Sequence, residues 1–377
     1  YDLIKILQNY IRFFFRIINF ALNINNKKMK EFFKYVLDTI LGIFIYSVLW
    51  IILLILIFGI IVSTVSVSEK KVVEKNSVLL INLDQPVPDR TPSNPFEMGN
   101  MFNMKPVTGL YDIIRSINKA KNDDNIKGIF LDLTQVQTGF TKLSEIREAL
   151  LDFKKSGKFI YSYSTTYTQG VYYIGSVSDS VFIQPEGVFV FNGLAWTTVH
   201  IKKLLSNIGV EPIVIRHGKY KSAVETFSSE KMSEENKLQI KSLLATMKNE
   251  FFGNISKSRN ISIEKLNNIA DSLLVTTCYD ALKYGLVDRV AYKDEVIVSI
   301  NRRLKQSDKA DINFITLSKY SKIIGEESVD RNNRIAVIFA EGEIYSNNTN
   351  EAAISPDKIA KAFAKAREND KIKAVVF

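Results

Sequence analysis

The sequence predicts an α/β protein with a mainly parallel sheet, preceded by one transmembrane helix. Three observations support this. An uncharged apolar run covers residues 40–62, short apolar segments then alternate with amphipathic ones, and the pattern that begins near residue 76 returns near residue 334. Strands that alternate with helices are typical of βαβ crossovers, and these crossovers join parallel strands.

The apolar run reads ILGIFIYSVLWIILLILIFGIIV and contains no charged residue. At about 1.5 Å per residue it is long enough to cross a hydrocarbon core of ~30 Å. Its length, its uniform Ile/Leu content and the lack of a small-x-small cleavage site favour a retained helix over a cleaved signal peptide. We therefore expect residues 40–62 to span the membrane.

The segment before this span, residues 1–39, is basic. Seven Lys or Arg and only two acidic residues lie before residue 35. This excess predicts a cytoplasmic N-terminus. We expect a single-pass protein of the inner (cytoplasmic) membrane, with its body on the periplasmic or extracytoplasmic side. Met29 resembles a natural start, so residues 1–28 are interpreted as upstream sequence read in frame or as an amphipathic surface helix. The first interpretation is favoured.

The elements beyond the span follow from apolar periodicity. Leu110, Ile113, Ile114 and Ile117 share one helical face, and Ser233 is a suitable N-cap for a long helix. GLVDRV, at 285–290, continues from a short helix into a strand. The strands are predicted at 76–84, 126–133, 158–164, 180–185 and 211–217, and the helices at 109–122, 142–155, 169–176, 197–208, 233–259 and 276–285.

The chain contains an internal repeat. Residues 118–131 align without a gap on 364–377, with identities at Lys119, Ala120, Asp124, Ile126 and Lys127, and residues 76–87 align on 333–344. Two matches in the same order indicate duplication. We predict a first repeat at 76–300, a polar linker at 301–333 and the start of a second repeat at 334–377. A lone βαβ unit would leave its sheet face uncovered, so we expect the sequence to be a C-terminally truncated piece of a longer protein.

Composition argues against several kinds of site. The single cysteine, Cys278, allows no internal disulfide, and the two histidines, His200 and His217, make a histidine-rich metal centre unexpected. The net charge is +10, but the body has no Lys/Arg tract with interleaved aromatic residues. We therefore expect no metal, no cofactor and no nucleic-acid partner.

The motifs GKYKSAVETF, followed by MSEE and a long helix, and DALKYGLVDRV resemble signal peptide peptidase A in its long, two-repeat, membrane-anchored form. YYIGSVSDSVFIQPEGVFVFNG, at 172–193, and the duplication support the resemblance. It covers the chain from about residue 76 onward. It implies a ClpP/crotonase-like fold of repeated ββα units. It also implies a serine peptidase that degrades cleaved signal peptides or other short peptides near the bilayer, as a homo-oligomer.

The resemblance implies a Ser/Lys dyad divided between the repeats. Lys221 matches the lysine base of the first repeat, and the serine belongs to a Gly-Gly-Ser turn after the strand that matches KIKAVVF. At the equivalent place of the first repeat the sequence is TQVQTGFTK, at 134–142. The given residues would therefore hold the base without the nucleophile, and as given they would not be active alone.

A lysine can act as a base only when its neutral form is favoured, and burial provides this by penalising the ammonium. Lys221 follows the apolar IVI segment and precedes small residues, which would let a second domain approach. We expect Glu225 to point away from Lys221, since a close carboxylate would stabilise the ammonium. Lys219 is interpreted as a rim residue and His217 as a rim or core residue. Ser222 is interpreted as a helix start rather than as a hydrogen-bond partner of the ammonium or a water, and His200 and Cys278 as structural.

Two other functions stay open. The chain could be a membrane-anchored scaffold of the same fold that binds peptides or partners without cutting them. A crotonase-like acyl-thioester enzyme is a third possibility, which an extracytoplasmic body disfavours because coenzyme A is cytoplasmic. The residues that follow the second-repeat strand, and a Lys221→Ala change, distinguish the peptidase from the scaffold.

Overall fold

The structure is a computed structural model of the 377-residue chain. It describes residues 12, 13, 16, 19, 27–65, 73–92, 107–323, 332–346 and 353–377. The chain divides into two compact units, Tyr1–Lys71 and Val72–Phe377. Each unit is described by itself.

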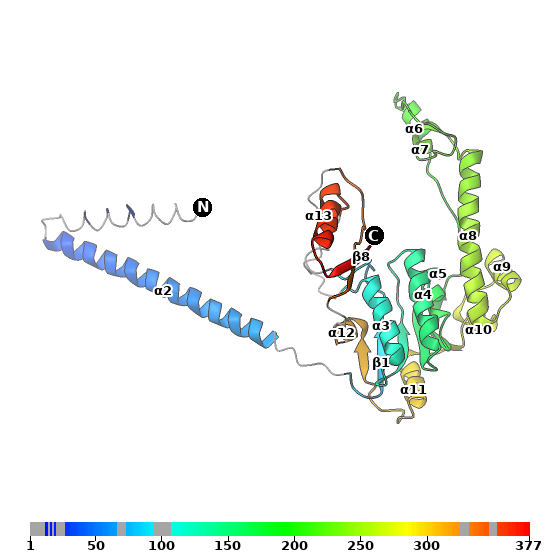
Figure 1. Ribbon diagram of the computed structural model, residues 1–377, viewed down its shortest axis with the longest axis horizontal. Helices are drawn as coiled ribbons and strands as arrows, with labels where there is room; N and C mark the ends of the chain where they lie inside the picture. Colours follow the sequence, from blue (N-terminus) through cyan, green and yellow to red (C-terminus); the bar gives the residue numbers. More distant parts are fainter. Residues whose placement is uncertain are drawn as a thin grey trace. The chain divides into compact units, whose positions relative to one another are not determined.

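The first unit contains one long helix, α2, at Lys27–Val65 (Figure 1). Within it, Lys30–Ile57 is long and apolar enough to cross a membrane, and it is the one such helix among the described residues. The predicted apolar helix is confirmed, although it begins earlier than residue 40. Most of residues 1–28 lie outside the described residues, so the two interpretations of that segment stay predictions.

The second unit is built on a six-stranded sheet with the order β5-β4-β3-β2-β1-β6. Every neighbouring pair in this sheet is parallel, as the alternation predicted. β1 and β2, in the middle of the sheet, are mostly buried and rich in apolar residues, which is typical of parallel sheets covered by helices. The strands are β1 at Ser77–Ile81, β2 at Ile126–Asp132, β3 at Phe159–Tyr167, β4 at Ser180–Phe189, β5 at Arg289–Val290 and β6 at Phe314–Thr316.

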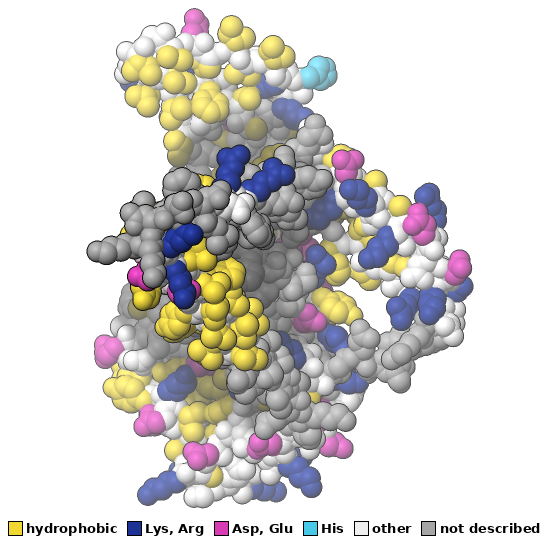
Figure 2. All heavy atoms as spheres, turned by 90° about the vertical axis from the view of Figure 1, so that its left-hand side faces the viewer, with side chains coloured by type: hydrophobic (Ala, Val, Ile, Leu, Met, Phe, Trp, Pro, Cys, Tyr) yellow, Lys and Arg dark blue, Asp and Glu magenta, His cyan; other side chains and the backbone are white. Residues whose placement is uncertain are grey.

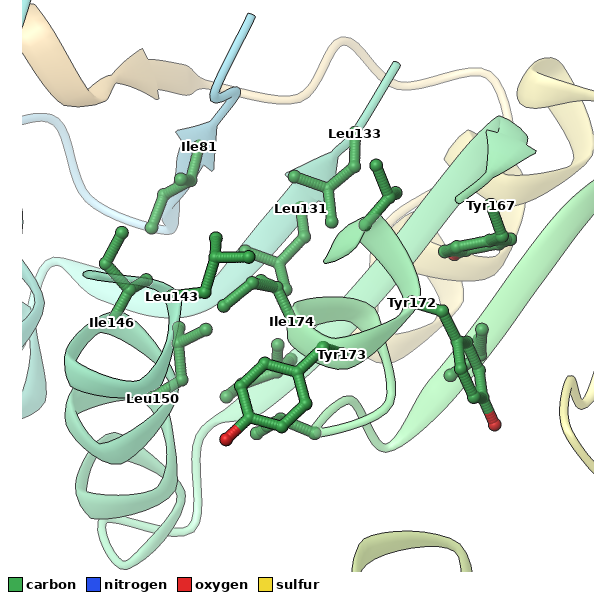
Figure 3. Packing of buried hydrophobic residues seen from close by; sticks show 14 of the residues in the cluster. Ile81, Leu131, Leu133, Leu143, Ile146, Leu150, Tyr167, Tyr172, Tyr173 and Ile174 are labelled. Carbon is green, nitrogen blue, oxygen red and sulfur yellow. The ribbon is translucent and has the colours of Figure 1, made fainter. Parts of the chain in front are cut away.

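Helices cover both faces of this sheet. One face packs on Leu79, Ile129 and Leu131 and carries the larger core, in which Figure 3 shows Leu143, Ile146 and Leu150 of α4 facing Ile174 and Tyr173 of α5. The other face packs on Phe130 and Phe159 and is covered by Val296 and Ile300 of α11. The helices of the body are α3 at Leu110–Asn122, α4 at Phe140–Lys154, α5 at Gln169–Gly175, α8 at Glu234–Arg259, α9 at Ile263–Asp271, α10 at Cys278–Lys283, α11 at Lys293–Arg303 and α12 at Leu317–Ile323.

Three predicted segments differ from the structure. Part of the predicted linker is structured, because β6 pairs with β1 and buries Leu317 and Tyr320 of α12 beside it. The predicted strand at 211–217 is irregular, and the predicted helix at 197–208 is reduced to α6 at Lys202–Asn207. Apolar alternation marked 211–217 as a strand, but the described residues provide no neighbouring strand to pair with it.

The internal repeat extends to individual hydrogen bonds. β7 at Arg334–Val337, α13 at Pro356–Arg367 and β8 at Ile372–Val376 form a second βαβ unit. Its parallel pair has the same register and the same irregularity as β1–β2: Ser77 pairs with Ile126 and Val78 with Gly128, and their equivalents are Arg334 with Ile372 and Ile335 with Ala374.

The turns before β2 and β8 also correspond. Ile126 N donates to Asp123 O over 3.0 Å, and Ile372 N donates to Asn369 O over 2.8 Å. Asn125 N donates to the Asp123 carboxylate over 3.0 Å, and Lys371 N donates to the Asn369 amide oxygen over 3.1 Å. The correspondence of backbone, turn and register confirms that the βαβ pattern is repeated. The wider division into a first repeat, a linker and a second repeat stays a proposal.

Candidate functional site

Lys221 lies on an arm that extends from the body between β4 and α8. The arm contains α6, α7 at Glu225–Ser228 and the loop between them, and it joins the N-terminal end of α8 (Figure 1). Gly218, with a φ of 101°, provides the left-handed residue of a tight turn, which closes through Lys221 N and Gly218 O at 3.4 Å. The Lys221 side chain is exposed.

The arm has no apolar core of its own. Between residues 192 and 250, all of which the structure describes, the buried residues are Glu225 and Asn236, and both are polar. Ile213 and Ile215 are 91% and 95% exposed, and Figure 2 shows apolar side chains gathered over the α6–α7 end of the molecule, at its top. The N-terminal part of α8 belongs to the same exposed region, because the apolar residues of α8 are buried only from Phe251 onward.

The Glu225 carboxylate makes the main polar contacts of the arm. Ser233 donates to it through Oγ at 2.5 Å and through its backbone N at 3.2 Å, and Asn236 donates through Nδ2 at 3.0 Å. Ser233 is the N-cap of α8, so the carboxylate lies at the positive end of that helix. Burial raises the pKa of Glu225, but the hydrogen bonds from Ser233 and Asn236 outweigh burial and hold the pKa below its usual range.

Arg216 connects this carboxylate with the main chain of Lys221. Its Nη1 lies 3.8 Å from Glu225 Oε1 and donates to Lys221 O at 3.0 Å. His200 fixes the other side of α7, with Nδ1 at 3.2 Å from Glu225 O and 3.1 Å from Ser229 O. As expected, Glu225 turns toward α8 and not toward the Lys221 ammonium.

The structure also places the other residues that the sequence singled out. Lys219 and His217 are exposed, and His200 is half-buried against α7, which agrees with a structural role. Cys278 is buried in the body. The loop between β2 and α4 contains Gln137 and no serine. In the second repeat, the resemblance would place the nucleophile in the equivalent loop. Among the described residues no group of three His, Cys, Asp or Glu side chains could hold a metal ion.

Sequence reasoning did not single out the residues that anchor α8 to the body. Arg259 forms a bidentate pair with Asp288 at 2.9 and 2.7 Å and also donates to Gly285 O at 3.1 Å. Asp288 in turn accepts from Val181 N at 2.8 Å, which fixes the start of β4. The aspartate of GLVDRV was the available signal, but nothing local in the sequence indicates that its partner is Arg259.

Comparison with known proteins places these features in a family. The model of peptidase family S49 matches residues 152–307, a range that includes α5, β4, the whole arm, α8 and the Arg259–Asp288 pair. Residues 152–307 of the chain are thus similar to the domain of peptidase family S49. The S49 domain therefore encloses Lys221 and the residues that surround it.

Individual relatives agree with the S49 assignment. The chain is 32% identical over 276 residues to "Protease 4" of Salmonella typhi and 29% identical over 277 residues to "Protease 4" of Haemophilus influenzae. It is 28% identical over 313 residues to "Serine protease SPPA, chloroplastic" of Arabidopsis thaliana. These matches cover 71%, 71% and 81% of the chain but only 44%, 45% and 44% of the relatives. The chain thus spans less than half the length of these relatives, and its resemblance to signal peptide peptidase A is confirmed.

Proposed function

We propose that this chain is part of a membrane-anchored serine peptidase that hydrolyses cleaved signal peptides or other short apolar peptides, with Lys221 as its general base. The observation that carries the proposal is the S49 match, because it encloses the Lys221 loop. The relatives are named as proteases, and this supports the same reaction class.

The reaction requires a serine that attacks the peptide carbonyl carbon. The amine of Lys221 takes the serine proton and then delivers it to the leaving amine, while backbone N–H groups hold the oxyanion. We assign the serine to the second repeat, in the turn after the strand equivalent to β2. The matched geometry of β1–β2 and β7–β8 and the serine-free β2–α4 loop support this assignment.

Because Lys221 is exposed, another part of the complete protein has to shield its amine from water. An exposed ammonium stays solvated, and a neutral amine is favoured only when water is excluded. The second repeat or another copy of the chain must therefore cover the arm, which agrees with a homo-oligomer. The bare apolar side chains of Ile213 and Ile215 support such a cover.

Lys221→Ala tests this function in the full-length protein with a fluorogenic signal-peptide substrate. We expect kcat/KM to fall by roughly 100- to 10,000-fold, the usual contribution of general acid–base catalysis. Lys219→Ala is the matched control, since Lys219 is exposed on the same turn, and it should change kcat/KM by less than about threefold because it takes no part in proton transfer. Full activity in Lys221→Ala would remove this residue from the mechanism.

A non-catalytic scaffold is the second candidate. The exposure of Lys221 and the serine-free β2–α4 loop favour it for these residues taken alone. The scaffold predicts that the full-length protein binds signal peptides without hydrolysing them. The same assay decides between the two functions.

A further inference from the structure

We propose that Glu225 is the positioning residue for Lys221: its buried carboxylate, in place of an apolar core, holds the loop that carries the base. This inference rests on the proposed function, because it concerns the same lysine. It adds a residue whose side chain points away from the reacting groups.

The interior of the arm is polar. Glu225 is 2% exposed and Asn236 is 7% exposed, and between residues 192 and 250 no apolar side chain is buried. A buried carboxylate is stable only when donors surround it. Here Ser233 and Asn236 supply three hydrogen bonds. The conformation of the arm therefore depends on this charged cluster.

Arg216 connects the Glu225 carboxylate with Lys221. Glu225 N donates to Ser222 O at 2.9 Å, which ties the residue after Lys221 to the start of α7. Arg216 lies between Glu225 Oε1 and Lys221 O, at 3.8 and 3.0 Å. Lys221 is thus held from its carbonyl side through Arg216 and the carboxylate, and from the following turn through the backbone N of residue 225, a contact that any residue at this position would make.

Removing the carboxylate changes the contacts of the cluster. In Glu225→Ala the hydroxyl of Ser233, the N-cap of α8, loses the carboxylate that accepts its hydrogen bond. Arg216 loses the same carboxylate as its anionic partner. In Glu225→Gln the amide oxygen can still accept from Ser233 N and Asn236 Nδ2, while the amide nitrogen faces the Ser233 hydroxyl, which can also accept. Glu225→Gln therefore keeps the shape of the cluster without its charge.

The test uses the full-length protein and the same peptidase assay. We expect Glu225→Ala to lower kcat by about 100-fold with KM within about threefold, because a misplacement of about 1 Å costs a catalytic group that much. Glu225→Gln should recover at least about tenfold of this loss, because it keeps the hydrogen bonds that position the loop. The matched control is Glu234→Ala, whose carboxylate is 83% exposed and pairs with Lys237; it should leave kcat unchanged.

A readout independent of activity follows the loop itself. Trypsin cleavage after Lys219, Lys221 and Lys231 should accelerate by at least about tenfold in Glu225→Ala, and not in Glu234→Ala, because local opening exposes the chain. An unchanged cleavage rate, or an unchanged kcat, in Glu225→Ala overturns the proposal. If Lys221→Ala stays active, the proposed function fails, and the cleavage rates still decide whether Glu225 holds the loop.

Arg216→Ala keeps the test decisive if Glu225→Ala does not fold, because the Arg216 side chain is 39% exposed and its loss leaves the cluster at Ser233 intact. We expect kcat to fall about tenfold, a part of the loss that full misplacement causes. An unchanged kcat in Arg216→Ala breaks the path from Glu225 to Lys221 and overturns the proposal.

Discussion

Replacing Arg147 by alanine should strongly destabilise the body. Arg147 is 1% exposed, and it donates to Tyr173 O and Ser176 Oγ of the α5 region and to Asn254 O and Ser258 Oγ of α8. Arg147 itself lies in α4. One guanidinium therefore joins three helices on one face of the sheet. Among the described residues no carboxylate pairs with it within 4.0 Å.

The magnitude follows from the cost of removing these contacts. Each hydrogen bond to a charged group contributes about 1.5–3 kcal/mol, and the desolvation of the guanidinium offsets several kcal/mol of the total. Alanine also leaves a cavity where the guanidinium lies over the Tyr173 ring, 4.7 Å from its centroid. We expect a loss of about 3–5 kcal/mol in the free energy of unfolding. At about 2–4 °C per kcal/mol, Tm should fall by roughly 6–20 °C.

Thermal unfolding followed by circular dichroism measures this loss. Arg147→Met separates packing from hydrogen bonding, because it fills the stem without donors, and it should cost less than alanine. Lys155→Ala is the control: its side chain is 74% exposed and pairs with Asp152 one turn away, so it should change stability by less than about 0.5 kcal/mol. A decrease in Tm of less than about 2 °C for Arg147→Ala, at the scale of 2–4 °C per kcal/mol, would refute the reasoning.

Two further predictions concern acid stability and topology. Hydrogen bonds from Thr277 and Thr276 lower the pKa of Asp280 to about 2. The stability that they contribute is present above the unfolded pKa of about 4 and lost as the pH falls toward 2, so Asp280→Asn should flatten the fall in Tm over this window; an unchanged pH profile would contradict it. Cys278 is buried and should stay silent toward membrane-impermeant maleimide. In intact cells Lys219→Cys should then label at once and Lys30→Cys only after permeabilisation, whereas labelling of Lys30→Cys alone would place the body in the cytoplasm.

Several elements could be predicted because their signals are local. The Ser233 N-cap, the Gly285 stop after α10 and the helices of the body follow from residues within one or two turns of each other. The internal repeat was visible as an alignment, and its turns repeat because Asp123 and Asn369 can both accept from a backbone N–H two residues ahead. Periodicity and turn chemistry were therefore enough to predict a parallel sheet.

Other elements depend on partners that are distant in the sequence. β6 has only three residues and forms because the edge of β1 offers backbone groups to it, while 211–217, which contains the apolar run IVI, finds no neighbouring strand among the described residues. Strand propensity describes how a side chain fits a sheet and supplies no hydrogen-bonding partner. The same limit applies to Arg147, Arg259 and Asp288, whose partners lie on other helices and strands.

The sequence by itself determined the apolar helix, the parallel α/β body, the repeated βαβ unit and the family that points to Lys221. The tertiary structure decided how the lysine is presented. It places Lys221 exposed on an arm whose interior is Glu225 and Asn236, with Arg216 between the carboxylate and the Lys221 carbonyl. The physical reason is that burial and hydrogen bonding of a charged group are set by every element around it, and no local pattern encodes that set.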